Sequence, residues 1–334
     1  MDKRPTIKDV AARAGVSKST VSLVLQNSAL VKDETRVLVR QAAADLGYVR
    51  NRAAATLRGA GTGLVGLVIN DLRNPFFTEF ATSAQMAFAK RGYATVIANS
   101  DEDPKIQETT IAGMLEHDVS ALLISPCYGG GDAALEAIDR AGIPALQVLR
   151  NTRGVASALP FFSYDYAKGS ILAMGHLRDA GLRRIAFVGG LAGRDITAER
   201  QGGYLEGMRA MGVKPLILPG RATRAFGRAA AAQLLRDHPQ TEGAICFNDL
   251  TALGLMAGLA EAGKTPGRDM AVVGFDDIEE AQLSHPRLTS IRCDIEAFGA
   301  RAAEIVMTWL DTGTPPPALP RVPVSLQPRA SSRR

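Results

Sequence analysis

The chain has 334 residues, of which 46% are hydrophobic and 22% charged, a balance that predicts a globular protein of two or three domains. It contains no run of about 18 uncharged apolar residues, so we expect no membrane-spanning helix, and its three widely spaced cysteines argue against a disulfide framework or a metal cluster. The net charge of +5 is uneven, because residues 1–62 hold 11 Lys/Arg against 5 Asp/Glu, so that this segment carries +6 and the rest −1.

A basic segment of this kind is typical of a module that meets phosphate, although a solvated basic surface has the same composition. The first residues are polar and give no sign of a secretory signal, so we expect a cytoplasmic protein.

A first helix is predicted to begin at Ile7, because Thr6 and Asp9 stand three residues apart, which is the spacing of a capping box. Gly15 is expected to end this helix, since glycine readily adopts the left-handed backbone of a tight turn. Ser17 is then the expected cap of a second helix.

The second helix is expected to expose a polar face made of Lys18, Ser19 and Ser22. A third helix, roughly Glu34 to Leu46, is predicted to follow, with Asp33 as its cap and Gly47 at its end. Three helices with a glycine turn between the first two form the helix-turn-helix arrangement, whose second helix enters the major groove of DNA.

The next segment, Asn51–Arg58, is rich in alanine, which favours a helix. It is nevertheless shorter than the ~12–15 residues that an isolated helix needs in water, so we expect it to order only against a partner helix and DNA. Leu57 would then be an exposed apolar side chain that wedges between minor-groove base steps. The alternative is a plain flexible linker, and spacing alone does not decide between the two.

From Leu64 onward, apolar β-rich runs alternate with helical stretches such as Phe77–Arg91, Ala167–Ala180 and Ala225–Arg236. The predicted strands form two series: Leu64–Ile69, Tyr93–Ala98, Ala121–Ser125 and Ala145–Leu149, then Phe161–Tyr164, Arg184–Val188, Ala244–Phe247 and Ala271–Phe275. This alternation predicts parallel sheets covered by helices on both faces. A break near Asn151–Pro160 indicates two α/β subdomains, and a ligand is expected in the cleft between them, at the carboxyl ends of the strands.

Polar residues follow many of these strands, where they would face a ligand in the cleft: Asn70, Asp71, Ser125, Asp165, Asn248, Asp249, Asp276 and Asp277. Asp and Asn at strand ends also cap the next helix, so each of these positions keeps that alternative. Arg200, early in a predicted helix, is either a ligand donor or half of a surface salt bridge.

These segments resemble the lac repressor / galactose repressor family of bacterial transcription regulators over essentially the whole chain. The matching segments are Thr6–Ser22, Leu46-Gly-Tyr48, the hinge Asn51–Leu57, Asn74-Pro-Phe76-Phe77, Glu199-Arg200, Phe247-Asn248-Asp249 and Val273-Gly-Phe-Asp276-Asp277.

The resemblance implies an N-terminal all-α helix-turn-helix domain (residues 1–49), a hinge helix with a linker (50–62) and an α/β core (63–334) like that of the periplasmic sugar-binding proteins. The core would consist of two doubly wound parallel-sheet subdomains joined by three crossovers. The N-subdomain is expected at about 63–160 and 292–320, and the C-subdomain at about 161–291 and 321–330. The resemblance also implies that the hinge folds on DNA with Leu57 intercalated at the centre of a palindrome.

Two sets of site residues follow from the pattern and the resemblance together. The expected DNA-binding residues are Thr6, Ser17, Lys18, Ser19, Thr20, Ser22, Leu23, Asn27, Arg36, Asn51, Ala54 and Leu57. The expected effector-binding residues are Asp71, Phe76, Phe77, Ser125, Arg150, Phe162, Arg200, Asn248 and Asp276. Relatives often carry a polar residue at the position of Leu23, and leucine cannot make a bidentate contact with guanine.

One segment departs from the family, because Gly220-Arg-Ala222-Thr lacks the aromatic residue that often covers the ligand there. Either Phe161 or Phe162 replaces that ring, or the ligand is not a sugar ring. Arg150 is expected where a strand opens into the cleft, a position from which it would bind an acidic effector.

No leucine heptad follows the predicted strand Val322–Leu326, so we expect a homodimer, whose two-fold symmetry suits a palindromic operator. We interpret the chain as a repressor that binds double-stranded operator DNA under the control of a small-molecule effector, without a cofactor, a metal or a membrane partner. The alternatives are an enzyme and a solute-binding protein. The sequence shows no phosphate loop, zinc motif or nucleophile elbow, and its four histidines are isolated.

Overall fold

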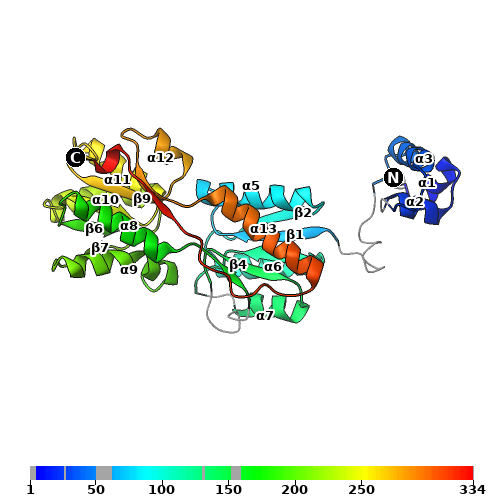
Figure 1. The fold of residues 1–334 in the computed structure, drawn as a ribbon, viewed down its shortest axis with the longest axis horizontal. Helices are drawn as coiled ribbons and strands as arrows, with labels where there is room; N and C mark the ends of the chain where they lie inside the picture. Colours follow the sequence, from blue (N-terminus) through cyan, green and yellow to red (C-terminus); the bar gives the residue numbers. More distant parts are fainter. Residues whose placement is uncertain (1–4, 26–27, 50–61, 130–131, 152–158, 334) are drawn as a thin grey trace. The chain divides into compact units, whose positions relative to one another are not determined.

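The structure is a computed structural model that describes residues 5–25, 28–49, 62–129, 132–151 and 159–333 (Figure 1). The chain divides into two compact units, residues 1–62 and 63–334. None of the described helices is long and apolar enough to cross a bilayer. Within the same residues, no three His, Cys, Asp or Glu side chains gather in a group that would hold a metal ion.

The smaller unit consists of α1 (Ile7–Ala14), α2 (Lys18–Leu25) and α3 (Asp33–Asp45), packed around buried Val10, Val21, Val24 and Val39. The predicted caps of the first two helices are confirmed. The Asp9 carboxylate accepts hydrogen bonds from the Thr6 N–H and hydroxyl, both at 2.7 Å, and Ser17 Oγ accepts the Thr20 N–H at 3.0 Å. Gly15 ends α1 with a left-handed backbone, φ 66°.

The third helix begins one residue earlier than predicted. Asp33 is its first residue rather than its cap, and Lys32 at the cap position makes no side-chain cap hydrogen bond. Asp33 therefore acts through its charge, which is favourable at the positive end of the helix and pairs with Arg36 at 3.4 Å.

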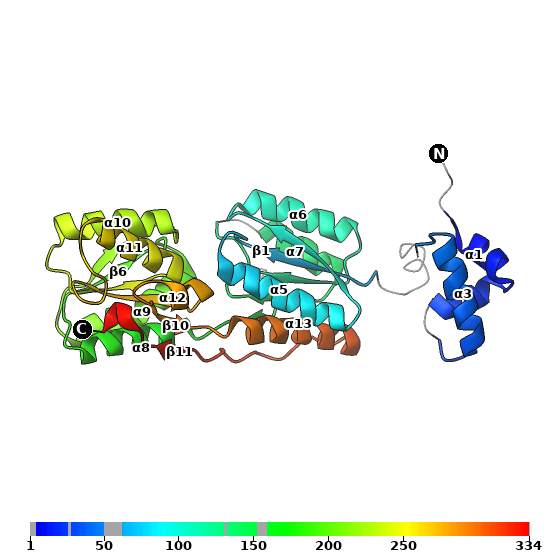
Figure 2. The same cartoon turned by 90° about the horizontal axis from the view of Figure 1, so that it is seen from above.

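The first sheet of the larger unit has five parallel strands in the order β2-β1-β3-β4-β5. They are β1 (Leu64–Ile69), β2 (Ala94–Asn99), β3 (Ala121–Ile124), β4 (Ala145–Val148) and β5 (Phe161–Phe162). One face is covered by α5 (Pro75–Lys90) and α13 (Ile295–Thr312), and the other by α6 (Pro104–Glu116) and α7 (Asp132–Ala141) (Figure 2). In β1, Leu67 faces the first pair and Val68 the second, because successive strand residues point to opposite faces.

The second sheet has six strands in the order β11-β10-β9-β8-β6-β7, all parallel to their neighbours except β11, which runs antiparallel to β10. They are β6 (Ile185–Val188), β7 (Leu216–Leu218), β8 (Gly243–Cys246), β9 (Ala271–Asp276), β10 (Thr289–Arg292) and β11 (Ser325–Gln327). One face is covered by α8 (Tyr166–Asp179) and α9 (Asp195–Ala210), and the other by α10 (Arg224–Asp237) and α11 (Asp249–Glu261). A short α12 (Glu279–Leu283) follows β9, and a 3₁₀ turn (Ala330–Ser332) lies near the end of the chain.

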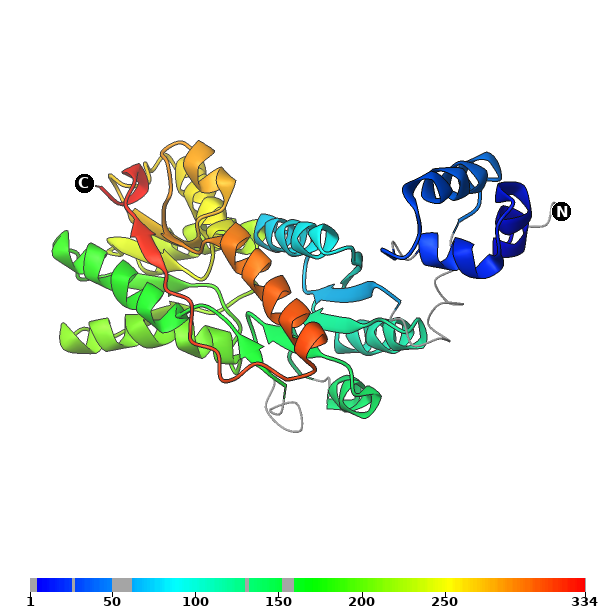
Figure 3. The same cartoon turned by 45° about the vertical axis from the view of Figure 1, so that its right-hand side comes forward.

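The chain passes between the two sheets three times, after β5, after β10 and after α13 (Figure 3). The passing segments bind one another. Val322 accepts a hydrogen bond from the Asp165 N–H and donates one to the Ser163 carbonyl, both at 2.9 Å. The Tyr164 hydroxyl donates to the Asp294 carbonyl at 3.2 Å. We call these three segments, residues 163–165, 293–294 and 321–322, the crossover joint.

Two strand predictions need correction, and two strands were not predicted. The strand predicted at Phe161–Tyr164 in the second series belongs to the first sheet as β5, because Phe161 pairs with Gln147 of β4. Neither β7 nor β10 was predicted, since β7 has only three residues and the Thr and Ser of β10 interrupt its apolar pattern. The predicted strand Val322–Leu326 begins later, at Ser325, because Val322 pairs with Tyr164 in the crossover joint.

Helices α10 and α11 approach closely at Gly227, where an added Cβ would overlap the carbonyl oxygen of Thr251. We therefore predict that Gly227→Ala lowers the free energy of unfolding by ~1–3 kcal/mol, since the helices must move apart. Gly202→Ala is the matched control: its Cβ would meet nothing, so helix propensity should make it neutral or up to ~1 kcal/mol stabilising. Denaturant titration of the full chain measures both, and equal effects of the two substitutions would refute the packing argument.

Candidate functional site

A pocket of about 550 Å³ lies in the cleft between the two sheets, lined by residues that follow the carboxyl ends of β1, β4, β8 and β9. This is where parallel α/β sheets bind ligands. The structure brings most of the predicted effector residues to this pocket: Asp71, Phe76, Phe77, Arg150, Arg200, Asn248 and Asp276.

The wall formed by the second sheet is built on a buried ion pair between Arg200 of α9 and Asp276 at the end of β9. Arg200 Nη2 lies 3.1 Å from Asp276 Oδ1, and both side chains are 5% exposed. Arg200 Nη1 also donates to the Phe247 carbonyl. The alternative of a surface salt bridge for Arg200 is therefore wrong, because the pair is shielded from water and screened far less than a surface pair.

Three aromatic rings enclose the Arg200 guanidinium. Its Cζ lies 4.1 Å from the ring centroid of Phe275, 4.6 Å from that of Tyr166 and 4.7 Å from that of Phe247. A cation over an aromatic face is attracted by the ring quadrupole, more strongly where water is excluded. The rings thus hold the guanidinium in place, yet its Nε is buried without a hydrogen-bond partner among the residues that the structure describes.

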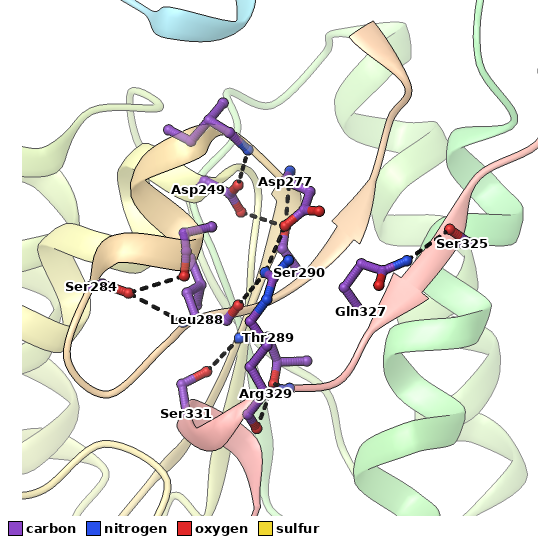
Figure 4. Close-up of polar contacts among 12 residues, drawn as sticks. Asp249, Asp277, Ser284, Leu288, Thr289, Ser290, Ser325, Gln327, Arg329 and Ser331 are labelled. Carbon is purple, nitrogen blue, oxygen red and sulfur yellow. Dashed lines mark hydrogen bonds and ion pairs between the residues drawn. The ribbon is translucent and has the colours of Figure 1, made fainter.

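A polar network behind the wall supports the end of β9 (Figure 4). Asp249, the first residue of α11, accepts hydrogen bonds from Ser290 Oγ at 2.6 Å and from the Ile278 N–H at 2.9 Å. Arg329, from the C-terminal segment, places its Nη1 2.6 Å from Asp277 Oδ1. The contact is an ion pair and not a hydrogen bond, because no N–H group is aligned with that oxygen.

This support matters because Asp276 and Asp277 both have positive φ angles, 120° and 60°, which L-residues rarely adopt. The surrounding contacts hold that backbone in place, as is common where strain coincides with a binding site.

Burial changes the acidity of the two carboxyl groups. It raises the pKa of Asp249 to about 8, helped by the nearby Asp276 carboxylate. It also raises the pKa of Asp276, to about 6, against the opposing effect of Arg200. Of the two carboxyl groups, Asp276 has the Arg200 cation beside it and Asp249 does not. The geometry therefore favours a protonated Asp249 next to an ionised Asp276.

Asn248 combines the two functions that the sequence left open. Its Oδ1 caps α11 by accepting the Thr251 N–H at 3.0 Å and the Thr251 hydroxyl at 2.8 Å. The side chain also lines the pocket while only 4% exposed, and its Nδ2 has no partner within the described part of the chain.

The wall formed by the first sheet presents two rings at the start of α5. Asn74 caps this helix by accepting the Phe76 N–H at 3.2 Å, and Pro75 fits the first turn, where no hydrogen bond is needed. The cap fixes Phe76 and Phe77, whose rings meet edge to face at 5.4 Å between centroids. Both rings are buried and line the pocket, so they give this wall an apolar part beside its charged residues.

Arg150 lies in the pocket as predicted, but it is not free. Its Nη1 donates to Glu102 at 2.8 Å, and its Cζ lies 5.3 Å from the ring centroid of Tyr128. Tyr128 also touches the opposite wall, where its hydroxyl accepts the Ile196 N–H at 3.2 Å and its ring lies 4.7 Å from the Arg194 guanidinium. Tyr128 is thus a direct contact across the cleft, which must break if the subdomains open.

Two predicted effector residues do not line the pocket. Ser125 is fully buried and donates to Asn70 beneath the end of β1. Phe162 is stacked on Phe298 of α13, with centroids 4.5 Å apart and planes at 4°, so it belongs to the core of the first subdomain. It therefore does not replace the missing aromatic ring.

Sequence reasoning missed several residues of the pocket: Arg73, Asp101, Glu102, Tyr166, Arg221, Thr223 and Arg224. Most of them follow the polar strand ends by a few residues or open a helix, and a search of helix N-termini next to strand ends would have found Tyr166 and Thr223.

In the smaller unit, Ser17, Lys18 and Ser19 are exposed together at the start of α2, as a DNA-reading surface requires. Thr6 is exposed as well, whereas Thr20, Ser22 and Leu23 are half-buried, and Leu23 packs against the core of the three helices. The predicted contacts Asn27, Asn51, Ala54 and Leu57 lie outside the described residues.

Arg36 has a structural task that the sequence did not indicate. Its Nε donates to the Val31 carbonyl at 3.0 Å and its Nη2 to the Ser28 carbonyl at 2.6 Å. Its guanidinium therefore holds the connection between α2 and α3, which leaves it fewer donors for DNA.

Comparisons with known proteins match both units. Residues 6–51 match the model of the bacterial regulatory proteins of the lacI family, and residues 174–332 match a periplasmic binding protein-like domain. The HTH-type transcriptional regulator CelR of Thermobifida fusca is 31% identical over 325 residues, which cover 94% of each chain.

Solved structures agree. The lac repressor dimer bound to operator and the anti-inducer ONPF has a TM-score of 0.87 at 26% identity, covering 99% of this chain and 100% of that one. A complex of the transcriptional regulator CelR with cellobiose has a TM-score of 0.74 at 28% identity, covering 98% of this chain and 100% of that one. The predicted fold class is thereby confirmed.

The raised pKa of Asp249 predicts a pH effect on stability. Because the folded state binds this proton more tightly than the unfolded chain, the protonated group stabilises the fold below the unfolded pKa of 3.8, and the contribution is lost as pH rises towards about 8. Asp249→Asn removes this titrating group. The free energy of unfolding of the variant, measured relative to that of wild type, should therefore rise as the pH increases from about 5 to 8. Denaturant titrations across this range test the effect, and stability curves that stay parallel would contradict it.

Proposed function

Since the chain belongs to the lacI family of bacterial regulatory proteins, we propose that it represses transcription as a homodimer whose affinity for a palindromic operator depends on a small molecule in the cleft pocket. The observation that carries this proposal is the pairing of an exposed polar helix start in a helix-turn-helix unit with a pocket between two subdomains. We also propose residues 1–49, 50–62 and 63–334 as its DNA-binding, hinge and core regions.

The DNA-reading surface in this proposal is the start of α2. Lys18 and Ser19 are exposed there, and the excess positive charge of residues 1–62 supplies attraction to phosphate that does not depend on sequence. Leu57 is proposed as the minor-groove wedge, and Leu57→Ala should weaken specific binding while sparing non-specific binding.

Control by the effector rests on the two-walled pocket. Arg200, Asn248 and Asp276 offer donors and acceptors from one subdomain, and Phe76 and Phe77 offer apolar faces from the other. A ligand that touches both walls favours one separation of the subdomains, and it shifts operator binding only by its difference in affinity between the two arrangements. Cellobiose in the complex of the similar CelR supports a sugar or a related metabolite as the class of effector.

The dimer has support from an exposed sheet edge. Among the described strands, β2 pairs with β1 alone and forms the edge of its sheet, and its Val96 and Ile97 are 43% and 38% exposed. An apolar free edge of this kind invites pairing with another chain. The dimeric state of the similar lac repressor agrees with this assignment.

We further propose that the chain carries out no catalysis and acts in the cytoplasm. The charged side chains of the pocket are largely committed to ion pairs with one another, an arrangement suited to recognition rather than to proton transfer. The regulators among its relatives support the same view.

Selection of bound duplexes from a random DNA library tests the function directly. The full chain should enrich a palindrome, and Lys18→Gln should reduce discrimination of that sequence from random DNA by ~10-fold or more. Lys8→Gln, which removes an equal charge from an exposed position on α1, should weaken both kinds of binding equally. Failure of the wild-type chain to enrich any palindrome, with and without candidate effectors, would refute the function.

The proposed dimer edge is tested by Val96→Glu. A carboxylate buried without a partner costs several kcal/mol, so self-association measured by analytical ultracentrifugation should weaken by at least ~10-fold. Ile171→Glu alters a side chain of similar exposure, 42%, on α8 and should leave the dimer intact. An unchanged dimer in Val96→Glu would place the interface elsewhere.

A further inference from the structure

We propose that the effector carries an anionic group, a carboxylate or a phosphate, which binds Arg221 and the N-terminus of α10 on one wall of the cleft pocket. The inference rests on the proposed function, because it assigns a chemical class to the ligand of the same pocket.

The first observation is the charge balance of the pocket. Its lining holds five arginines against four carboxylates. Arg73 pairs with Asp71 and Asp101, Arg150 with Glu102, Arg200 with Asp276, and Arg224 with Glu280 beyond the lining. Arg221 is left over, since no side chain among the described residues pairs with its guanidinium. With Glu280 counted, the five arginines face five carboxylates, two of which share Arg73, so Arg221 is the guanidinium of the lining that remains available to a ligand.

The second observation is the placement of Arg221 in the connection from β7 to α10. Gly220 packs beneath Phe226, where a Cβ would overlap the ring, so the connection lies close against the helix. Thr223 caps α10 by accepting the Phe226 N–H at 3.2 Å, which leaves its hydroxyl proton free to donate. A helix N-terminus carries partial positive charge and favours an anion. Arg221, Thr223 and the first turn of α10 all line the pocket, and together they form the anion-binding corner of this proposal.

The third observation comes from buried donors elsewhere on this wall. The Nε of Arg200 is buried without a partner among the described residues. The Nδ2 of Asn248, which lines the pocket, also has no partner among them, although that atom is not fully buried. Buried donors without acceptors are costly, so this wall calls for a ligand rich in acceptor oxygens. Hydroxyl groups of a neutral sugar would satisfy Asn248, but they would leave the Arg221 charge unpaired, whereas a carboxylate or phosphate satisfies both needs.

The test uses the full chain and four matched probes, D-glucose, D-gluconate, D-glucuronate and glucose 6-phosphate, with inorganic phosphate as a fifth, in isothermal titration calorimetry. We expect at least one anionic probe to bind more tightly than glucose, with affinity that falls as salt rises. Arg221→Gln should weaken that probe by at least ~10-fold, because a charge-assisted contact is lost. Arg228→Gln is the control, since Arg228 lies on the same helix, outside the pocket, paired with Glu261 at 2.7 Å.

The outcomes distinguish a failure of the anionic-effector inference from a failure of the proposed function. Binding of gluconate or glucuronate identifies the anion as a carboxylate, and binding of the phosphates identifies it as a phosphoryl group. Binding of glucose alone, binding of an anion unaffected by Arg221→Gln, or no binding by any probe overturns the inference. The proposed function falls only if the duplex selection also yields no palindrome.

Discussion

The buried ion pair between Arg200 and Asp276 is the constraint on which the pocket depends. Two charges that are 5% exposed are tolerable only because each neutralises the other, and removing one partner typically costs ~3–5 kcal/mol by leaving an uncompensated buried charge. Three aromatic rings hold the guanidinium, and the Asp249 network holds the unusual backbone at Asp276. The wall is thus preorganised before any ligand arrives, which reduces the entropic cost of binding.

The same pocket is divided between two subdomains that three passing segments of the chain join. The crossover joint binds the three passing segments to one another through Tyr164 and Val322, while Tyr128 bridges the cleft to Ile196 and Arg194. A ligand placed between the walls competes with or reinforces these contacts, and it shifts the separation of the subdomains by its difference in affinity between the two arrangements. In this way, the binding of a small molecule in the pocket would change the affinity of the DNA-binding unit for its operator.

Much of this architecture was predictable because buried parallel strands are continuous apolar runs, and β1 was predicted with its observed bounds. The strands that were missed, β7 and β10, are short or polar, so periodicity does not find them. Residues just after strand ends were found because the strand direction fixes where they lie. The prediction that Ser125 and Phe162 line the pocket was wrong, because the sequence does not reveal which neighbour covers a side chain. Asn70 covers Ser125, and Phe298 covers Phe162. The pairing of Arg150 with Glu102 needed the tertiary fold, since the two residues are far apart in sequence.

The coupling between the pocket and the DNA-binding unit is tested most directly by measuring it in both directions on the full chain. Operator affinity with and without a saturating pocket ligand gives one coupling factor, and affinity for that ligand with and without operator gives the other. Because the four binding steps form one thermodynamic cycle, the two factors must agree, and we expect a common value of about 5–150. A factor of one in both directions would contradict the coupling and leave the pocket and the DNA-reading surface as independent sites.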